Sequence, residues 1–101
     1  MANLERTPRF SVIIPTKDRA PYLHHTLRTC SLQDYDNLDV VVSDDGSTDQ
    51  TRDVVEEAAR KDPRIRYVTP GPGVGMRDNF EFALDQVKPG YVIALCGDDG
   101  L

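Results

Sequence analysis

Cysteine is scarce in this 101-residue chain, which holds only Cys30 and Cys96. The two lie far apart and form no closely spaced pair, which excludes a cysteine-rich zinc site and a disulfide framework. Each falls within an apolar stretch, so we expect both to be buried free thiols. Free thiols are typical of a reducing compartment, and the expected location is therefore the cytoplasm.

Basic residues are fewer than acidic residues in this chain. The chain has 12 Lys and Arg against 17 Asp and Glu, a net charge of −5, and its isoelectric point is about 4.8. Because no basic stripe offsets this charge, nucleic acid and anionic membrane surfaces are disfavoured as partners. A ligand that carries phosphate would be repelled unless a divalent cation accompanied it.

Long apolar runs are missing as well. No segment approaches the roughly 18 residues that a membrane span requires. The first ten residues, MANLERTPRF, lack the apolar core of a signal peptide. We expect a soluble chain, while a longer parent protein could still associate with the periphery of a membrane.

A regular alternation of strand and helix signals is present, in a chain with the length of one domain. Four β-rich runs are expected to be strands: residues 10–14, 38–42, 64–68 and 91–95. The first, second and fourth are nearly all apolar, as is typical of strands covered on both faces. Because helical spacing separates the runs, we predict an α/β fold, a Rossmann-like parallel sheet with helices on both faces.

Local signals set the expected helix limits. Pro21 suits the first turn of the first helix. Ser47 and Gln50 have the spacing of a capping box at the start of the second. That helix should end near Asp62, because Pro63 disfavours helical backbone in the residue before it.

Polar residues follow the strands at the edge where parallel sheets bind ligands. Residues 15–19 (PTKDR) follow the first strand, Asp44 and Asp45 the second, and Asp98 and Asp99 the fourth. The segment 15–19 is equally consistent with a plain strand-to-helix turn and with a pocket wall. The two acidic pairs favour function, because together they suit a hard divalent cation shared with a substrate's phosphate oxygens.

A glycine-rich segment, residues 71–75, follows the third strand. Its G-x-G-x-G spacing differs from the dinucleotide fingerprint, and no Gly-Lys-Ser/Thr follows it, so neither a dinucleotide site nor a P-loop is predicted. Two interpretations stay open: a plain flexible loop, or a mobile loop that covers a ligand, with Arg77 available for a phosphate.

Three motifs stand in a specific order: FSVIIPTKDR, VVVSDDGSTD and GYVIALCGDDG. Together they resemble the N-terminal half of a family 2 glycosyltransferase with the GT-A fold, and residues 76–84 are similar to the helix before the acidic motif in one branch of that family. The resemblance covers residues 10–101. It implies a transferase that moves a sugar from a nucleotide-diphosphate donor, most often a UDP-sugar, to an acceptor that stays unidentified. Residues 1–101 would be the nucleotide-diphospho-sugar-binding part of a GT-A domain, truncated at its C-terminus.

The resemblance also implies roles for individual residues. Pro15, Thr16 and Asp18 match the segment that lines the nucleoside pocket of the family. Asp45 matches the aspartate that hydrogen-bonds the base, with Asp44 beside it.

The remaining roles concern the diphosphate. Arg77 stands near the place of a basic residue that approaches the nucleotide. Asp98 and Asp99 match the last two places of the Asp-x-Asp (DXD) motif, where the first faces the ribose and the second holds Mn²⁺ or Mg²⁺; both are candidate metal ligands. Gly97 replaces the first aspartate of that motif, which favours Asp99 as the metal ligand. No catalytic base is assigned, because the family places it beyond Leu101, and the fragment alone is expected to be inactive.

These roles require a particular topology. Asp45 and Asp99 can reach one pocket only if the strand order is 3-2-1-4. The fourth strand should then have an exposed flank, and we expect self-association through residues 91–95.

Two other functions stay open: a non-catalytic nucleotide-binding module and a signalling receiver domain. The receiver is disfavoured because Val68-Thr69-Pro70 supplies no aspartate after the third strand.

Overall fold

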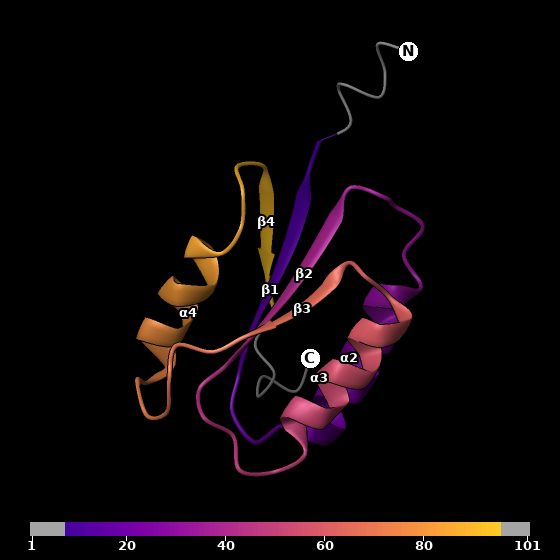
Figure 1. The fold of residues 1–101 in the computed structure, drawn as a ribbon. Helices are drawn as coiled ribbons and strands as arrows, with labels where there is room; N and C mark the ends of the chain where they lie inside the picture. Colours follow the sequence, from indigo (N-terminus) through magenta and orange to yellow (C-terminus); the bar gives the residue numbers. More distant parts are fainter. Residues whose placement is uncertain (1–7, 96–101) are drawn as a thin grey trace, which may run out of the picture.

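The computed structural model describes residues 8–95 (Figure 1). Strands and helices alternate in it as predicted. The elements are β1 (Phe10–Thr16), α2 (Ala20–Ser31), β2 (Leu38–Asp44), α3 (Thr51–Lys61), β3 (Ile65–Val68), α4 (Met76–Asp85) and β4 (Tyr91–Ala94). No helix within this part of the chain is long and apolar enough to cross a bilayer.

The strands form one parallel sheet in the order β3-β2-β1-β4, which confirms the predicted topology. In the register of the central pairs, Phe10 lies opposite Leu38 on β2 and Tyr91 on β4. Each parallel pairing requires a crossover, and the helices supply it. All carboxyl ends of the strands therefore point to the same edge of the sheet (Figure 1).

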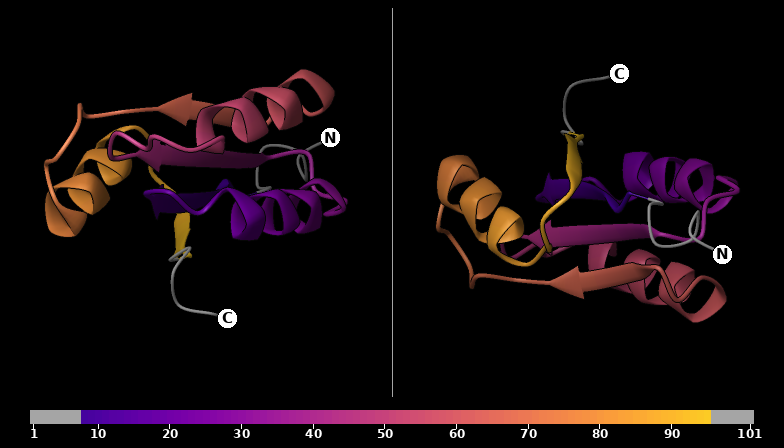
Figure 2. Two further views of the ribbon diagram at one scale, coloured as in Figure 1. Left: turned by 90° about the horizontal axis from the view of Figure 1, so that it is seen from below. Right: turned by 90° about the horizontal axis from the view of Figure 1, so that it is seen from above.

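The helices cover both faces of the sheet, as expected: α2 and α3 lie on one face and α4 on the other (Figure 2). Side chains of a strand alternate between faces, which divides the core in two. Val12 and Ile14 of β1 pack in the cluster under α2 and α3, whereas Ile13 packs with Val41 and Ala83 under α4. The continuous apolar runs of β1 and β2 are explained by this double cover.

Strand β4 is the exception to the expected double cover. Tyr91, Val92 and Ile93 are 62%, 41% and 47% exposed, although their sequence is as apolar as that of β1. The strand pairs with β1 on one side only, and no described helix packs extensively against it. The expectation that helices cover both faces of β4 is therefore wrong within residues 8–95. The expected exposed flank of this strand is confirmed.

The helix limits agree with the sequence at two points and differ at one. Helix α2 begins with Pro21 in its first turn, and α3 ends at Lys61, directly before Asp62. The predicted capping box at Ser47 and Gln50 is wrong, because α3 begins at Thr51 without a side-chain hydrogen bond from Gln50. The hydroxyl of Ser47 donates to Asp44 instead, at 2.5 Å.

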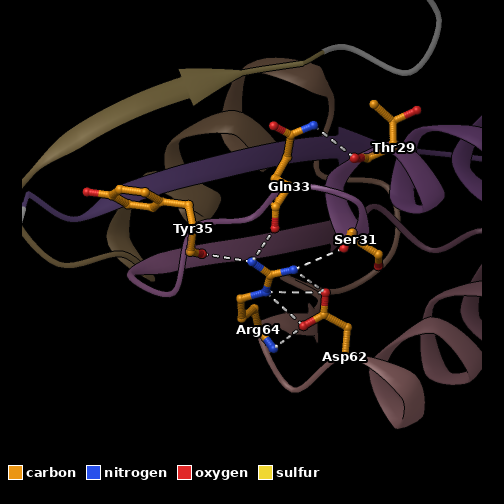
Figure 3. Close-up of polar contacts among 6 residues, drawn as sticks. All are labelled: Thr29, Ser31, Gln33, Tyr35, Asp62 and Arg64. Carbon is orange, nitrogen blue, oxygen red and sulfur yellow. Dashed lines mark hydrogen bonds and ion pairs between the residues drawn. The ribbon is translucent and has the colours of Figure 1, made fainter.

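The amino edge of the sheet is held by Arg64 (Figure 3). Its guanidinium pairs with the Asp62 carboxylate at 2.8 Å and donates to the backbone carbonyls of Ser31, Gln33 and Tyr35. Ser31 is the last residue of α2, and Gln33 and Tyr35 lie in the α2–β2 loop. One planar cation therefore satisfies three carbonyl acceptors at the end of the helix and in the loop that follows it. Hydrogen bonds from Arg64 lower the pKa of Asp62.

The thiol of Cys30 lies close to this cluster. The side chain is buried and its thiol is not part of a disulfide, as the sequence predicted. Burial raises the pKa of the thiol, and the charge of Arg64 opposes that shift. Cys96 lies outside the described residues.

Candidate functional site

A pocket of about 440 Å³ opens at the carboxyl edge of the sheet. It is formed where the β1–α2 loop, the end of β2 and the first turn of α4 meet. Its lining residues are Pro15, Thr16, Lys17, Asp18, Arg19, Asp45, Gly75, Met76 and Asn79. The structure thus brings together Pro15, Thr16, Asp18 and Asp45, which were predicted to share a site.

Asp45 sits at the start of α4, although it belongs to the β2–α3 loop. Its carboxylate accepts hydrogen bonds from the backbone N–H groups of Val74 (2.9 Å) and Gly75 (3.1 Å). Gly75 is the residue before α4, and no side chain of α4 itself caps that end. A carboxylate is favourable there because it accepts hydrogen bonds from N–H groups at the start of the helix. Its negative charge also interacts favourably with the positive end of the helix dipole. Asp45 therefore anchors the glycine-rich segment and α4 to the pocket.

The glycine-rich segment approaches the β2–α3 turn closely at Gly46. This residue has a φ of +74°, and a Cβ placed on it would lie 2.7 Å from Pro72. Glycine is required here on both counts, the left-handed backbone and the missing side chain. The contact keeps the segment 71–75 folded against the pocket beside Asp45.

Asp44 is placed differently from its neighbour. It is 1% exposed and does not line the pocket. Its carboxylate accepts from the backbone N–H and hydroxyl of Ser47 and from the hydroxyl of Tyr67, which is 2.7 Å away. Burial, with this hydrogen bond and the nearby charge of Asp44, raises the pKa of Tyr67 to about 12. Adjacent residues at a strand end point to opposite sides, which separates the two carboxylates.

Asp18 forms the turn between β1 and α2. Its backbone is in the left-handed region, with a φ of 52°, which costs about 1 kcal/mol for a residue that carries a side chain. Hydrogen bonds with residues of the β2–α3 loop stabilise this conformation. Asp18 N–H donates to the Ser47 hydroxyl at 2.7 Å, and its carboxylate accepts from the backbone N–H groups of Thr48 and Asp49.

Thr16 lines the pocket, and its hydroxyl is buried and unpaired within residues 8–95. The residue is 5% exposed, and its Oγ1 has no hydrogen-bond partner within the described chain. An unpaired buried hydroxyl costs roughly 1–3 kcal/mol. A ligand that offered a donor or acceptor at this point would recover that energy.

Asn79 of α4 was not predicted as a site residue. It is 2% exposed, lines the pocket, and is oriented by Ser43: its amide donates to the Ser43 carbonyl at 2.9 Å and its oxygen lies 2.5 Å from the Ser43 hydroxyl. The sequence does contain a pattern that could have identified Asn79 as a buried polar residue. Asn79 lies one helical turn before Ala83 on the apolar face of the helix, where a polar side chain needs a buried partner.

Positive charge at the pocket comes from Lys17 and Arg19, which the sequence reasoning also missed as site residues. The basic residue predicted for the nucleotide, Arg77, lies elsewhere. Its side chain is 88% exposed, is 3.8 Å from Glu81, and is not among the residues that line the pocket. The role predicted for Arg77 stays a prediction.

The predicted metal ligands Asp98 and Asp99 lie outside the described residues. Between residues 8 and 95, no group of three or more His, Cys, Asp or Glu side chains could hold a metal ion. Both oxygens of Asp45 accept backbone hydrogen bonds, and Asp45 belongs to no such group of ligands. Leu95 N–H donates to the Ile13 carbonyl, so the chain leaves β4 toward the same edge as the pocket. A metal ion at this edge would therefore depend on residues beyond Leu95.

A larger groove, about 910 Å³, lies between α2 and α3. It is lined mostly by residues of these two helices, and none of its lining residues was predicted for the site. Only Gln50, Asp62 and Arg64 of its lining residues lie outside the helices, and none directly follows the carboxyl end of a strand, so the smaller pocket is the better candidate despite its size.

Comparisons with known proteins agree with this geometry. The model of the family "Glycosyl transferase family 2" matches residues 11–101. The GalNAc(5)-diNAcBac-PP-undecaprenol beta-1,3-glucosyltransferase of Campylobacter jejuni is 36% identical over 93% of this chain. The match spans 31% of that enzyme, so this chain covers about a third of the relative's length.

Solved structures show the same fold. The mannosyltransferase PcManGT from Pyrobaculum calidifontis, in complex with GDP-Man and Mn²⁺, has a TM-score of 0.78 and 30% identity over 90% of this chain and 28% of its own. S. aureus TarS 1-349 in complex with UDP-GlcNAc has a TM-score of 0.75 and 30% identity over 89% of this chain and 26% of its own. The parallel sheet, its pocket at the carboxyl edge and the matching family model lead to one conclusion: this chain belongs to glycosyltransferase family 2 and has the GT-A fold.

Proposed function

We propose that this chain is the donor-binding part of a glycosyltransferase that transfers a sugar from a nucleotide diphosphate, with a UDP-sugar as the favoured donor. The observation that carries the proposal is the pocket in which Thr16, Asp45 and Asn79 converge at the carboxyl edge of the sheet. Support comes from the structural relatives, since the PcManGT structure is a complex with GDP-Man and that of TarS 1-349 a complex with UDP-GlcNAc.

In this proposal the nucleoside lies against Thr16 and Asp45. A carboxylate offers about four lone-pair sites. The backbone N–H groups of Val74 and Gly75 use part of that capacity in Asp45, which leaves room for an N–H donor of the base. The unpaired hydroxyl of Thr16 takes a second polar group of the nucleoside.

The diphosphate brings negative charge into an acidic chain. Lys17 and Arg19 line the pocket and attract it. A bound Mn²⁺ or Mg²⁺, held by Asp99 with Asp98, would neutralise charge on the departing diphosphate. The acceptor and the group that activates its hydroxyl stay unassigned. A cytoplasmic location also stays a prediction, which the free thiol of Cys30 supports.

A binding module without turnover is the second candidate, because the chain spans only 31% of the C. jejuni enzyme. Both candidates require nucleotide binding, and only the first requires sugar transfer. Because residues 1–101 alone are expected to be inactive, the assay uses a longer parent protein that contains them, incubated with UDP-glucose and simple sugar acceptors. Release of UDP that depends on the acceptor supports the transferase, whereas nucleotide binding without such release supports the binding module.

Titration calorimetry with UDP, GDP and ADP tests the donor site. We expect UDP to bind most tightly, and binding to be stronger in Mn²⁺ than in EDTA. Asp99→Asn should weaken the Mn²⁺-dependent binding. Asp85→Asn, at the exposed end of α4, is the matched control because it removes the same charge away from the pocket. Equal affinities for all nucleotides, unchanged by EDTA and by Asp99→Asn, would contradict the proposal.

A further inference from the structure

A chain of partly buried hydrogen bonds joins β3 to the wall of the pocket. The Tyr67 hydroxyl donates to Oδ2 of Asp44 at 2.7 Å. Oδ1 of the same carboxylate accepts the hydroxyl of Ser47 at 2.5 Å, and the Ser47 oxygen accepts the backbone N–H of Asp18 at 2.7 Å. The series therefore runs from Tyr67 through Asp44 and Ser47 to Asp18, and only Asp18 lines the pocket.

The protons in this series have one consistent arrangement. A backbone N–H can only donate, so the Ser47 oxygen must accept from Asp18. The Ser47 proton is then directed to Asp44, the acceptor at 2.5 Å. The other carboxylate oxygen of Asp44 is left for Tyr67, whose pKa of about 12 keeps its proton in place.

Asp18 needs this support more than an ordinary turn residue does. Its left-handed backbone is unfavourable unless surrounding bonds hold it. The bond to Ser47 holds its N–H, while Thr48 and Asp49 hold its carboxylate. Thr16, Lys17 and Arg19 lie on either side of the same turn, so the position of Asp18 sets where these residues face the pocket.

We propose that Tyr67 is a positioning residue of the donor pocket. It acts through Asp44 and Ser47 on the backbone of Asp18 and does not touch the ligand itself. This inference rests on the proposed nucleotide-binding function of the pocket. The resemblance assigned no role to Tyr67, and Asp44, predicted to bind substrate, becomes the link between Tyr67 and Ser47.

The hydroxyl of Tyr67 can be separated from its ring. The guanidinium of Arg52 lies over the ring, 5.4 Å from its centre, and the ring packs against the core under α3. Tyr67→Phe keeps both contacts and removes only the hydroxyl. Asp44 is 1% exposed, so its Oδ2 then has no water to replace the lost donor.

Tyr35→Phe is a matched control. The hydroxyl of Tyr35 donates to the Pro8 carbonyl at the amino edge of the sheet, opposite the pocket. Both variants therefore remove one tyrosine hydroxyl and one hydrogen bond to the protein. Measurements are UDP affinity in Mn²⁺ and the amide hydrogen exchange of Asp18, Thr48 and Asp49, both well below the melting temperature.

We expect Tyr67→Phe to weaken UDP binding about three- to tenfold, the effect of one lost hydrogen bond, and to speed exchange at these amides. Tyr35→Phe should change neither. In the double variant with Ser47→Ala, the loss of affinity should be clearly smaller than the product of the single losses, because both act through Asp44.

Unchanged UDP affinity and unchanged exchange in Tyr67→Phe would overturn the inference. Losses in the double variant that multiply fully would do the same, because they would show independent action. If the parent chain bound no nucleotide, the proposed function would fail instead. The exchange at Asp18, Thr48 and Asp49 would still decide whether Tyr67 holds this wall.

Discussion

The carboxylates of Asp44 and Asp45 are adjacent in the sequence and serve different parts of the molecule. Asp45 holds the start of α4 through the backbone N–H groups of Val74 and Gly75. Asp44 is turned to Ser47 and Tyr67 behind the pocket. The pair is therefore not one acidic cluster, and substitutions at its two members should have different consequences.

Asp45→Asn should lower both stability and nucleotide affinity. The variant loses the charge at the start of α4 and one of two backbone acceptors, which we expect to cost about 1–2 kcal/mol. For a domain of this size the melting temperature should fall by roughly 4–8 °C per kcal/mol. Asp85→Asn, which removes a charge from the other end of α4, should not lower it. Thermal melts with and without UDP measure both effects, and an unaltered melting temperature would contradict the capping role.

Thr16→Val should separate binding from stability. The hydroxyl of Thr16 has no partner in the described chain, so an isosteric methyl should leave stability unchanged or raise it by about 1 kcal/mol. UDP affinity should fall about three- to tenfold, because the pocket loses a polar contact. Ser11→Ala is the control: Ser11 also has an unpaired buried hydroxyl but lies at the other end of β1. Equal UDP affinity in the parent and Thr16→Val would remove Thr16 from the site.

Asp62 should make stability depend on pH at the acid end. Hydrogen bonds from Arg64 lower the folded-state pKa of Asp62 below its ordinary 3.8. The stabilisation is therefore present above about pH 4 and is lost as the pH falls through the lowered pKa. Asp62→Asn should be less stable by about 1–2 kcal/mol at pH 7. Urea unfolding from pH 7 to pH 2 should show this difference shrink, and a constant difference would contradict the ion pair's role.

The exposed strand β4 should cause self-association. Tyr91, Val92 and Ile93 offer an apolar surface next to a strand edge that pairs with no other strand among residues 8–95. Sedimentation velocity over a range of concentrations should show oligomers that Ile93→Lys abolishes. Leu32→Lys is the control, because Leu32 is an exposed apolar residue at the end of α2. A chain that stays monomeric at every concentration would contradict this expectation.

The sequence by itself determined that the sheet is parallel and at which edge the candidate site lies, and the strand order followed from the roles that the resemblance implied for Asp45 and Asp99. Apolar runs of strand length, separated by helical spacing, require parallel pairing, and parallel pairing places all loops after the strands at one edge. Pro15, Thr16, Asp18 and Asp45 could therefore be placed together before their contacts were known. The buried state of Cys30 and the end of α3 before Asp62 were also local consequences of sequence.

Only the tertiary structure decided which partner each polar group has. Ser47 has the spacing of a helix cap, yet its hydroxyl donates to Asp44, and Thr51 N–H at the start of α3 donates to Asp49 instead. The start of α4 is capped by Asp45, and Tyr67 reaches Asp44, across long sequence separations. Local patterns specify which groups need a partner, whereas the choice among distant partners depends on burial and distance, which exist only once the chain has folded.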